Sequence, residues 1–165
     1  MTYKRFVFEG NVHETLDCVP LTVRRKLDLV GLKISLSGWQ TLAREERLAL
    51  CHLPVDDAGE LAVYREIFEG FAARAGVPLS PLPNDASERT RWNSPRPPAP
   101  VQARLDALGC GLEPSRWTSL DEESRYALVK MAEPKRDPRK FAWVLQELGL
   151  IDPPDIARKA APDPT

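Results

Sequence analysis

The sequence contains few of the residues and motifs that mark enzymes. Among its 165 residues there are two histidines, and there is no glycine-rich phosphate loop, no H-E-x-x-H zinc motif and no serine nucleophile elbow. Paired carboxylates would leave no motif of this kind, because such pairs assemble only in the folded chain. We therefore expect no catalytic residues and a protein that is not an enzyme.

Net charge and long apolar runs are also missing. Lys and Arg total 23 against 24 for Asp and Glu, which gives a net charge of −1. A nearly neutral chain has no long-range attraction for nucleic acid or for anionic membranes. No apolar run approaches the length of a membrane span, and the first residues do not form a signal-peptide pattern. The sequence therefore predicts a cytoplasmic protein with no nucleic-acid partner and no membrane partner.

Cysteine is scarce and widely spaced. Cys18, Cys51 and Cys110 form no close pair of the kind that marks zinc ribbons and redox motifs. His52 follows Cys51, but adjacent side chains on a helix point in divergent directions and are poorly placed to bind one metal ion. We expect free thiols in a reducing compartment, no metal site and no cofactor.

What the sequence does contain is an internal repeat. When the chain is shifted by 78 positions, a segment of the first half aligns without a gap with a segment of the second half. The matching pairs include Pro20 and Pro98, Val23 and Val101, Leu27 and Leu105, Gly31 and Gly109, Ser37 and Ser115, Trp39 and Trp117, Leu42 and Leu120, and Arg47 and Arg125. This spacing predicts two copies of one supersecondary unit, each too small to bury its own apolar face well.

Each copy has the apolar periodicity and the end signals of four helices. We therefore predict an all-α fold of about eight helices, formed by two tandem four-helix repeats that pack around a shared core with pseudo-twofold symmetry. The predicted single domain covers residues 1–151, with a short extended N-terminal arm at 4–9, repeat one at about 18–77, a proline-rich linker at 78–97 and repeat two at about 98–151. A disordered proline-rich tail is predicted at 152–165.

Several helix ends are defined by single residues. Gly31 and Gly109 are expected to end the first helix of each repeat in the left-handed conformation. Ser37 and Ser115 are plausible caps for the short helix that follows. Asp137, followed by a proline, predicts the start of the last helix.

Three tryptophans are expected in the core. Trp39 and Trp117 occupy equivalent places among apolar neighbours, which favours burial over the alternative role of exposed anchors for a partner. Trp92 lies in the linker and is expected to dock against the helices.

One acid and one arginine also recur with the repeat. Asp28 and Arg47 in the first copy correspond to Asp106 and Arg125 in the second. The duplicated pair could bind an anion or a carboxylate. The interpretation that we favour is an ion pair within each repeat that fixes how two helices pack.

The densest basic cluster lies at the start of the last predicted helix. A helix N-terminus with basic side chains could bind a phosphate or an acidic partner surface, although exposed charges are most often only solvated. A second basic run lies in the first predicted helix. The candidate partner-binding residues are therefore Arg24, Arg25, Lys135, Arg136, Arg139 and Lys140.

Several stretches of the sequence resemble one family. They are the F-V-F-E run of residues 6–9, the stretch of residues 18–39 that combines Cys, Pro, Arg, Gly and Trp at fixed spacing, the W-T-S-L-D-E-E-S-R-Y run that opens residues 117–130, and the F-A-W-V-L-Q-E-L-G-L run of residues 141–150. Together they resemble the bacterial nitrate-reductase-associated proteins over nearly the whole chain. The resemblance implies association with molybdenum-dependent assimilatory nitrate reductase, and a need for such a protein in forming active enzyme.

The leading hypothesis is a non-enzymatic accessory or maturation factor that binds nitrate reductase or its cofactor-insertion machinery. The main alternative is a small-molecule carrier that holds a pterin or nucleotide cofactor in a cleft between the repeats, which would need arginine in its lining. An enzyme acting on the cofactor would need titratable groups that converge in a concave site. A nucleic-acid-binding regulator would need a continuous basic face.

Overall fold

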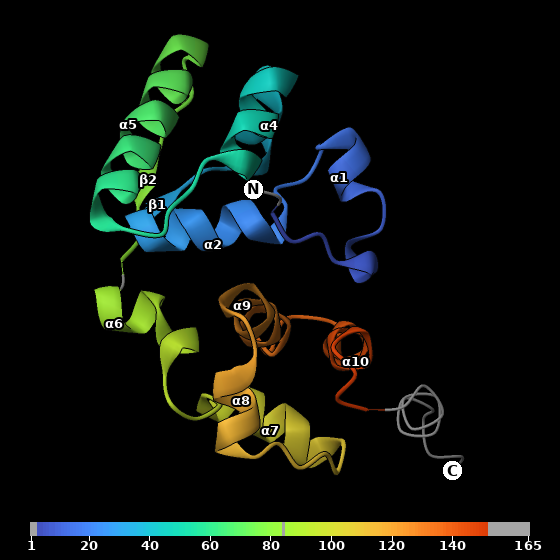
Figure 1. Ribbon diagram of the computed structural model, residues 1–165. Coiled ribbons are helices and arrows are strands. Elements are labelled where there is room, and N and C mark those ends of the chain that lie inside the picture. Colours follow the sequence, from blue (N-terminus) through green and yellow to red (C-terminus); the bar gives the residue numbers. More distant parts are fainter. Residues whose placement is uncertain (1–2, 84, 152–165) are drawn as a thin grey trace. The chain divides into compact units, whose positions relative to one another are not determined.

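Helices make up most of the regular structure in residues 3–83 and 85–151, the part of the chain that the computed structural model describes. That part contains ten α-helices, two short 3₁₀ helices and one ladder of two short strands (Figure 1), and the fold is 62% helical. The prediction of a helical protein is confirmed, but the all-α class is corrected by the strand ladder. The two helices beyond the predicted eight, α1 (Val12–Thr15) and α6 (Ala86–Arg89), have four residues each.

The described residues form two units. The first consists of residues 3–5 and Glu9–Thr90, and the second of Phe6–Phe8 and residues 91–151. The boundary therefore lies inside the predicted linker. A shared core, pseudo-twofold symmetry and a single domain over residues 1–151 depend on how the units are placed, so they stay predictions. The predicted tail at 152–165 lies outside the described residues.

The first unit is organised around α2 (Leu21–Val30). The other main elements of this unit are β1 (Leu32–Lys33), α3 (Leu36–Thr41), α4 (Arg44–His52), α5 (Ala58–Ala75) and β2 (Ser80–Pro81). Helix α2 packs against α4, α5 and α6, and α4 and α5 lie side by side (Figure 1). Strands β1 and β2 pair antiparallel, with Leu32 opposite Pro81.

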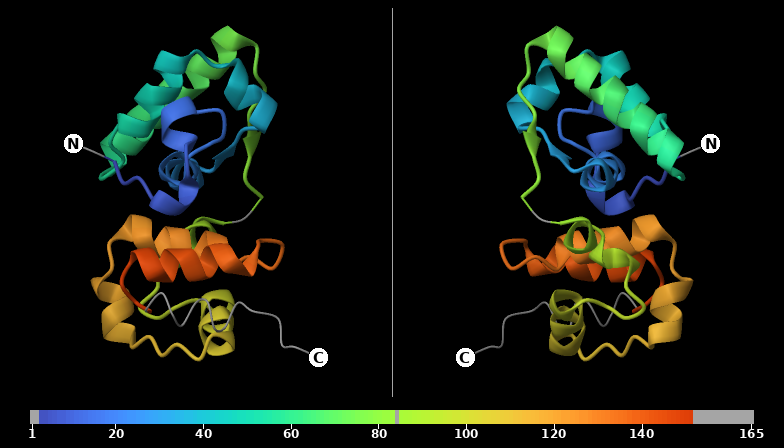
Figure 2. Two further views of the ribbon diagram at one scale, coloured as in Figure 1. Left: turned by 90° about the vertical axis from the view of Figure 1, so that its right-hand side faces the viewer. Right: turned by 90° about the vertical axis from the view of Figure 1, so that its left-hand side faces the viewer.

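The second unit is organised around α9 (Glu122–Met131). Its other elements are η2 (Arg91–Asn93), α7 (Ala99–Ala107), α8 (Pro114–Ser119), α10 (Pro138–Glu147) and the first two residues of η1 (Val7–Glu9). Helix α9 packs against α7, η2 and α10, and α9 and α10 lie side by side (Figure 2). The buried face of α10 carries Phe141, Val144 and Leu145, as the apolar spacing predicts.

The helix boundaries repeat at the spacing found in the sequence. The starts of α2 and α7, of α3 and α8, and of α4 and α9 are each separated by 78 positions. Helix α10 departs from this rule, because it begins 80 positions after α5 and has 10 residues against 18. The local structure of the first three repeated helices therefore follows the duplicated sequence.

The tryptophan predictions are confirmed. Trp39 and Trp117 are fully buried, and so is Trp92 from the predicted linker. The indole N–H of Trp92 donates a 3.0 Å hydrogen bond to Oε1 of Glu122, and its ring meets the Tyr126 ring edge to face at 4.9 Å. Burial of a large ring with its polar group paired stabilises the packing of η2 on α9.

The helix-end predictions are confirmed at the glycines and wrong at the serines. Gly31 and Gly109 have φ of 75° and 61°, the left-handed conformation that glycine adopts without strain. Ser37 and Ser115 lie inside α3 and α8. Ser35 caps α3 instead, because it has the extended backbone of an N-cap and its Oγ accepts a 3.0 Å hydrogen bond from the Gly38 N–H.

Arg47 and Arg125 donate to backbone carbonyls, and the predicted ion pairs with their repeat aspartates do not form within the described residues. Nη1 of Arg47 lies 2.7 Å from the carbonyl oxygen of Leu16, and Nε of Arg125 lies 2.9 Å from that of Trp92. Buried carbonyl groups need donors, and a guanidinium supplies five N–H groups. Both arginines therefore hold loops, which agrees with a structural role and corrects its mechanism.

The N-terminal arm is only partly extended. Residues 3–6 have no regular structure, whereas Val7–Glu9 forms the 3₁₀ helix η1. The Glu9 carboxylate explains why the arm turns here: its Oε1 accepts a 2.8 Å bond from the Leu21 N–H at the start of α2, and its Oε2 lies 2.7 Å from Nε2 of His13. A free helix N–H thereby gains an acceptor.

Candidate partner-binding surface

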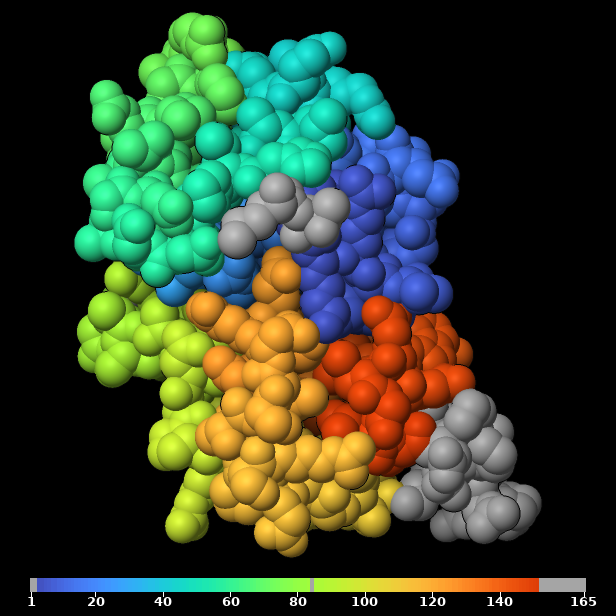
Figure 3. Space-filling view, in the orientation of Figure 1, coloured from blue at the N-terminus to red at the C-terminus, as the bar shows by residue number. Residues whose placement is uncertain are grey.

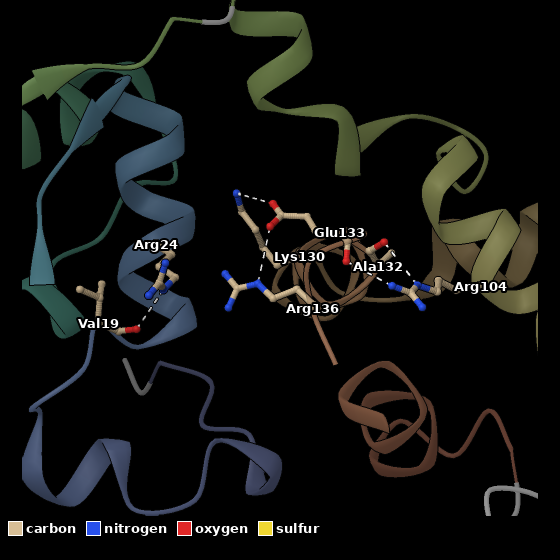
Figure 4. Close-up of polar contacts among 7 residues, drawn as sticks. All are labelled: Val19, Arg24, Arg104, Lys130, Ala132, Glu133 and Arg136. Carbon is tan, nitrogen blue, oxygen red and sulfur yellow. Dashed lines mark hydrogen bonds and ion pairs between the residues drawn. The ribbon is translucent and has the colours of Figure 1, made fainter. Parts of the chain in front are cut away.

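The turn between α9 and α10 is held from α7. The Arg104 guanidinium donates to the carbonyls of Ala132 and Glu133, at 3.5 and 3.2 Å (Figure 4). These carbonyls lie at the end of α9, where no further helical N–H is available to them. The positive side chain is also favoured by the negative end of the helix dipole. Arg104 therefore fixes the point from which the predicted basic cluster begins.

Glu133 lies between two basic side chains of this turn. Its Oε1 lies 3.5 Å from Nζ of Lys130, and its Oε2 lies 3.6 Å from Nε of Arg136 (Figure 4). All three side chains are partly exposed, so these ion pairs contribute little to stability and act mainly to orient the side chains. Arg136 is thus a paired cation.

Asp137 and Arg139 form the start of α10. Oδ1 of Asp137 accepts a 3.0 Å hydrogen bond from the Arg139 N–H, which caps the helix as predicted. The Arg139 guanidinium also grips the same carboxylate, with Nη2 at 2.8 Å from Oδ2. Hydrogen bonds from the Arg139 side chain and backbone lower the pKa of Asp137, and the carboxylate raises the pKa of Arg139.

Lys135 and Lys140 are the two cations of the cluster that remain available. Both are exposed, and neither side chain forms an ion pair or a hydrogen bond with another described residue. The structure thus brings Lys135, Arg136, Arg139 and Lys140 to one turn, and two of the four are engaged by neighbouring carboxylates. The charge that this turn offers to a partner comes mainly from the two lysines.

The other two predicted residues belong to α2 in the first unit. Arg24 is half-buried, and its Nε donates a 3.2 Å hydrogen bond to the carbonyl of Val19 (Figure 4). Arg25 is buried, with 8% of its surface exposed. The partner-binding role of both arginines, and their grouping with the turn at Lys135, stay predictions.

Trp143 is an exposed residue of α10 that is not among the candidate partner-binding residues predicted from the sequence. It lies on α10, four positions after Arg139 and three after Lys140, and 41% of its surface is exposed. The signal was present, because Trp143 falls outside the apolar stripe of Phe141, Val144 and Leu145. Part of α10 (red) lies on the face drawn in Figure 3.

A groove of about 380 Å³ runs beside Trp143. It is lined by Val7, Phe8, Trp143, Gln146 and Glu147. The Phe8 N–H donates a 3.1 Å hydrogen bond to Oε1 of Glu147, which holds η1 against the last turn of α10. Val7 is 83% exposed, so the groove presents two large apolar side chains to solvent. We call the groove and the turn from Lys135 to Lys140 the α10 surface.

The first unit has a groove of its own. It measures about 250 Å³, and its lining is Leu53, Pro54, Asp57, Gly59, Glu60, Val63 and Tyr64. No arginine lines this groove or the one beside α10, so neither matches the lining expected of a pterin or nucleotide carrier. The carrier hypothesis requires a cleft between the repeats, whereas each of these grooves lies within one unit. The hypothesis therefore stays a prediction.

The described residues carry neither a candidate metal site nor a candidate membrane span. The described side chains include no group of three or more His, Cys, Asp or Glu placed to hold a metal ion. None of the helices in residues 3–83 and 85–151 combines the length and the apolar character needed to cross a membrane. The three cysteines are free thiols: Cys18 is exposed, Cys110 is half-buried and Cys51 is buried.

Residues 5–148 match the family model described as conserved nitrate reductase-associated protein. No curated protein and no solved structure matches the chain. The matched range includes every helix and strand of both units, together with the α10 surface. The chain therefore belongs to the conserved nitrate reductase-associated protein family.

Proposed function

We propose that this protein is a cytoplasmic, non-enzymatic accessory or maturation factor for molybdenum-dependent assimilatory nitrate reductase. It acts by binding the reductase, or the machinery that inserts the reductase's cofactor. Binding would hold the reductase in a conformation open to cofactor entry, or would stabilise the finished enzyme. Family membership supports the association with nitrate reductase.

One observation carries the proposal of protein–protein binding. On the α10 surface, exposed Lys140 lies three positions before the exposed Trp143 on the same helix, and exposed Lys135 lies in the turn that leads into this helix. Tryptophan is enriched where proteins bind each other and its ring supplies affinity, whereas exposed charges such as those of the two lysines guide association.

The repeat bears on how such a factor arose. We propose that the two units are copies of one ancestral helical unit, since three pairs of helices begin 78 positions apart. The shorter α10 belongs to the second copy, and the groove beside it is completed by Val7 and Phe8 of η1. Duplication would leave one copy free to gain a binding surface while the other kept its packing.

The test is retention of purified nitrate reductase by the immobilised protein. The variant Lys135→Glu/Lys140→Glu reverses the two cations of the cluster whose side chains form no ion pair or hydrogen bond within the described residues. We expect roughly tenfold weaker retention at low salt and a smaller loss at high salt, because salt screens exposed charges.

The matched control is Lys33→Glu/Arg74→Glu, which makes the same charge change at two exposed positions of the first unit. This control should retain the reductase as the wild type does. Equal loss in both variants would mean that net charge alone decides binding. If the wild type retains neither cofactor-loaded nor cofactor-free reductase, nor the insertion proteins, the proposed function is wrong.

A further inference from the structure

Trp143 differs from every other tryptophan in the chain. Trp39, Trp92 and Trp117 are buried and each donates its indole N–H to a protein oxygen. Trp143 is 41% exposed, and its indole N–H donates no hydrogen bond to another described residue. Leaving a large aromatic ring in water forgoes a substantial part of its burial free energy, and such rings recur as the anchors of protein interfaces.

The groove beside this ring is already formed in the unbound protein. The bond from the Phe8 N–H to Glu147 fixes one wall, and the backbone of α10 fixes the other. A wall that is held before binding loses little conformational entropy when a ligand enters. With about 380 Å³, the groove is near the lower end of the roughly 300–1,000 Å³ typical of ligand pockets. It suits a few side chains of a partner segment.

Charge is distributed unequally along the α10 surface. Arg139 and Lys140 precede Trp143 by one helical turn and so lie on the same side of the helix. Lys135 adds a third cation in the preceding turn. At the other end, the carboxylate of Glu147 accepts from Phe8. A segment that fits must therefore bring apolar groups to the groove and negative groups to the start of α10.

We infer that this groove binds a segment of nitrate reductase in which a large apolar side chain lies within about one helical turn of two or more carboxylates. The apolar side chain packs between Val7 and Trp143, and the carboxylates face Lys140 and Lys135. This inference rests on the proposed function and names the chemistry of the partner at the α10 surface. The apolar contact supplies affinity and the charges set the direction of the bound segment.

The first experiment separates the two contributions by salt. Trp143→Ala and Val7→Ser are made singly, with Val63→Ser as a control, because Val63 is 52% exposed beside the other groove. Retention of the reductase by each variant is measured at low and high salt. We expect a loss of roughly 10- to 100-fold for Trp143→Ala and a smaller one for Val7→Ser, both unchanged by salt. Val63→Ser should have no effect.

The outcomes distinguish the inference from the proposed function. If the wild type retains the reductase and Trp143→Ala and Val7→Ser bind equally well, the groove assignment is overturned and the accessory role stands. If the wild type itself does not bind, both are overturned. Circular dichroism of each variant shows that it is folded, and both replaced side chains are exposed enough to be removed without loss of the core.

The second experiment identifies the occupant. Trp143 is replaced by the photoreactive p-benzoylphenylalanine, the complex with purified reductase is irradiated, and the cross-linked peptide is sequenced by mass spectrometry. We expect a reductase peptide with a large apolar residue close to acidic residues. A cross-link to residues 152–165 of the same chain, to a second copy of the chain, or to a basic reductase segment would contradict the inference.

Discussion

The indole N–H of Trp117 donates a 2.9 Å hydrogen bond to the backbone carbonyl of Ser94. In the first unit, Trp39 donates a 2.8 Å bond to the carbonyl of Leu16. Donor and acceptor are each 78 positions apart between the units, so a tertiary contact recurs at the spacing of the sequence repeat. In both units the bond ties a buried ring to the segment that precedes the first repeated helix.

Replacing either ring by phenylalanine tests this contact. Trp39→Phe and Trp117→Phe keep an aromatic ring and remove the N–H. The Ser94 carbonyl then loses its indole donor, and the Leu16 carbonyl keeps only the bond from Arg47. We expect each to lower the free energy of unfolding by about 1–3 kcal/mol in urea denaturation. Trp143→Phe should cost less than about 0.5 kcal/mol, since its ring is exposed. An equal cost at all three sites would contradict the role of the bonds.

Lys26 is expected to be a structural cation. It is buried in α2, and its Nζ donates to the carbonyls of Cys51 and Leu53 at 2.7 and 2.5 Å. Lys26→Met keeps the length of the side chain but removes the donors at the end of α4, at an expected cost of about 2–3 kcal/mol in urea denaturation. Lys33→Met at an exposed position is the control and should be nearly neutral. A neutral Lys26→Met would show that the two carbonyls find other donors.

A comparison of Gly31 with Gly76 separates the cost of a left-handed backbone from the cost of a contact with a neighbouring side chain. Its φ is 75°, and an added Cβ would lie 2.3 Å from Nη1 of Arg89. Gly76 has φ of 70° but open space around it. Gly76→Ala should cost about 1–2 kcal/mol from the left-handed backbone alone. Gly31→Ala should cost about the same in the same thermal or urea titration, because the contacted atoms are the flexible end of the Arg89 side chain, which can shift. A clearly higher cost at Gly31 would show that the Arg89 side chain is held in place.

Cys51 should make the protein less stable at alkaline pH. Burial raises the pKa of its thiol from 9.0 to about 11, although the charge of Lys26 opposes this shift. Between pH 9 and 11 the unfolded chain therefore loses a proton that the folded chain keeps, and the free energy of unfolding falls as pH rises. Burial raises the pKa of Tyr64 as well, so part of the fall belongs to that group.

The variant Cys51→Val isolates the thiol, because valine stands at the equivalent position 129 of the second copy. Urea denaturation midpoints measured from pH 8 to 11 should fall less steeply for Cys51→Val than for the wild type. Cys18→Ser, at an exposed cysteine, should keep the wild-type slope. Identical slopes in all three proteins would rule out Cys51 as a contributor.

Asp137 should have the opposite pH dependence. Its pKa is lowered by hydrogen bonds from Arg139, so its contribution is present above its ordinary pKa near 4 and is lost as pH falls below that value. Asp137→Ala should lower the melting temperature at pH 7 and make it less sensitive to acid. Asp17→Ala, at an exposed acid outside α10, is the comparison. Helix content followed by circular dichroism reports the loss at α10.

Local sequence patterns were sufficient to predict the positions of most of the helices. The apolar spacing of Phe141, Val144 and Leu145 predicts the buried face of α10, and Asp137 before a proline predicts its start, because both signals act within one or two helical turns. The wrong prediction of Ser37 as the cap of α3 also comes from relying on local signals. Ser37 and Ser35 are equally good caps by residue type, and only the backbone conformation that the tertiary structure imposes selects Ser35.

The sequence by itself determined the three pairs of helices that begin 78 positions apart, the left-handed ends at Gly31 and Gly109, and the burial of Trp39 and Trp117, because each depends on neighbours close along the chain. Only the tertiary structure decided which carbonyls the repeat arginines bind and that Val7 lies beside Trp143. Those contacts join residues tens of positions apart, or more than a hundred for the groove, and such distances carry no local periodicity from which pairing can be inferred.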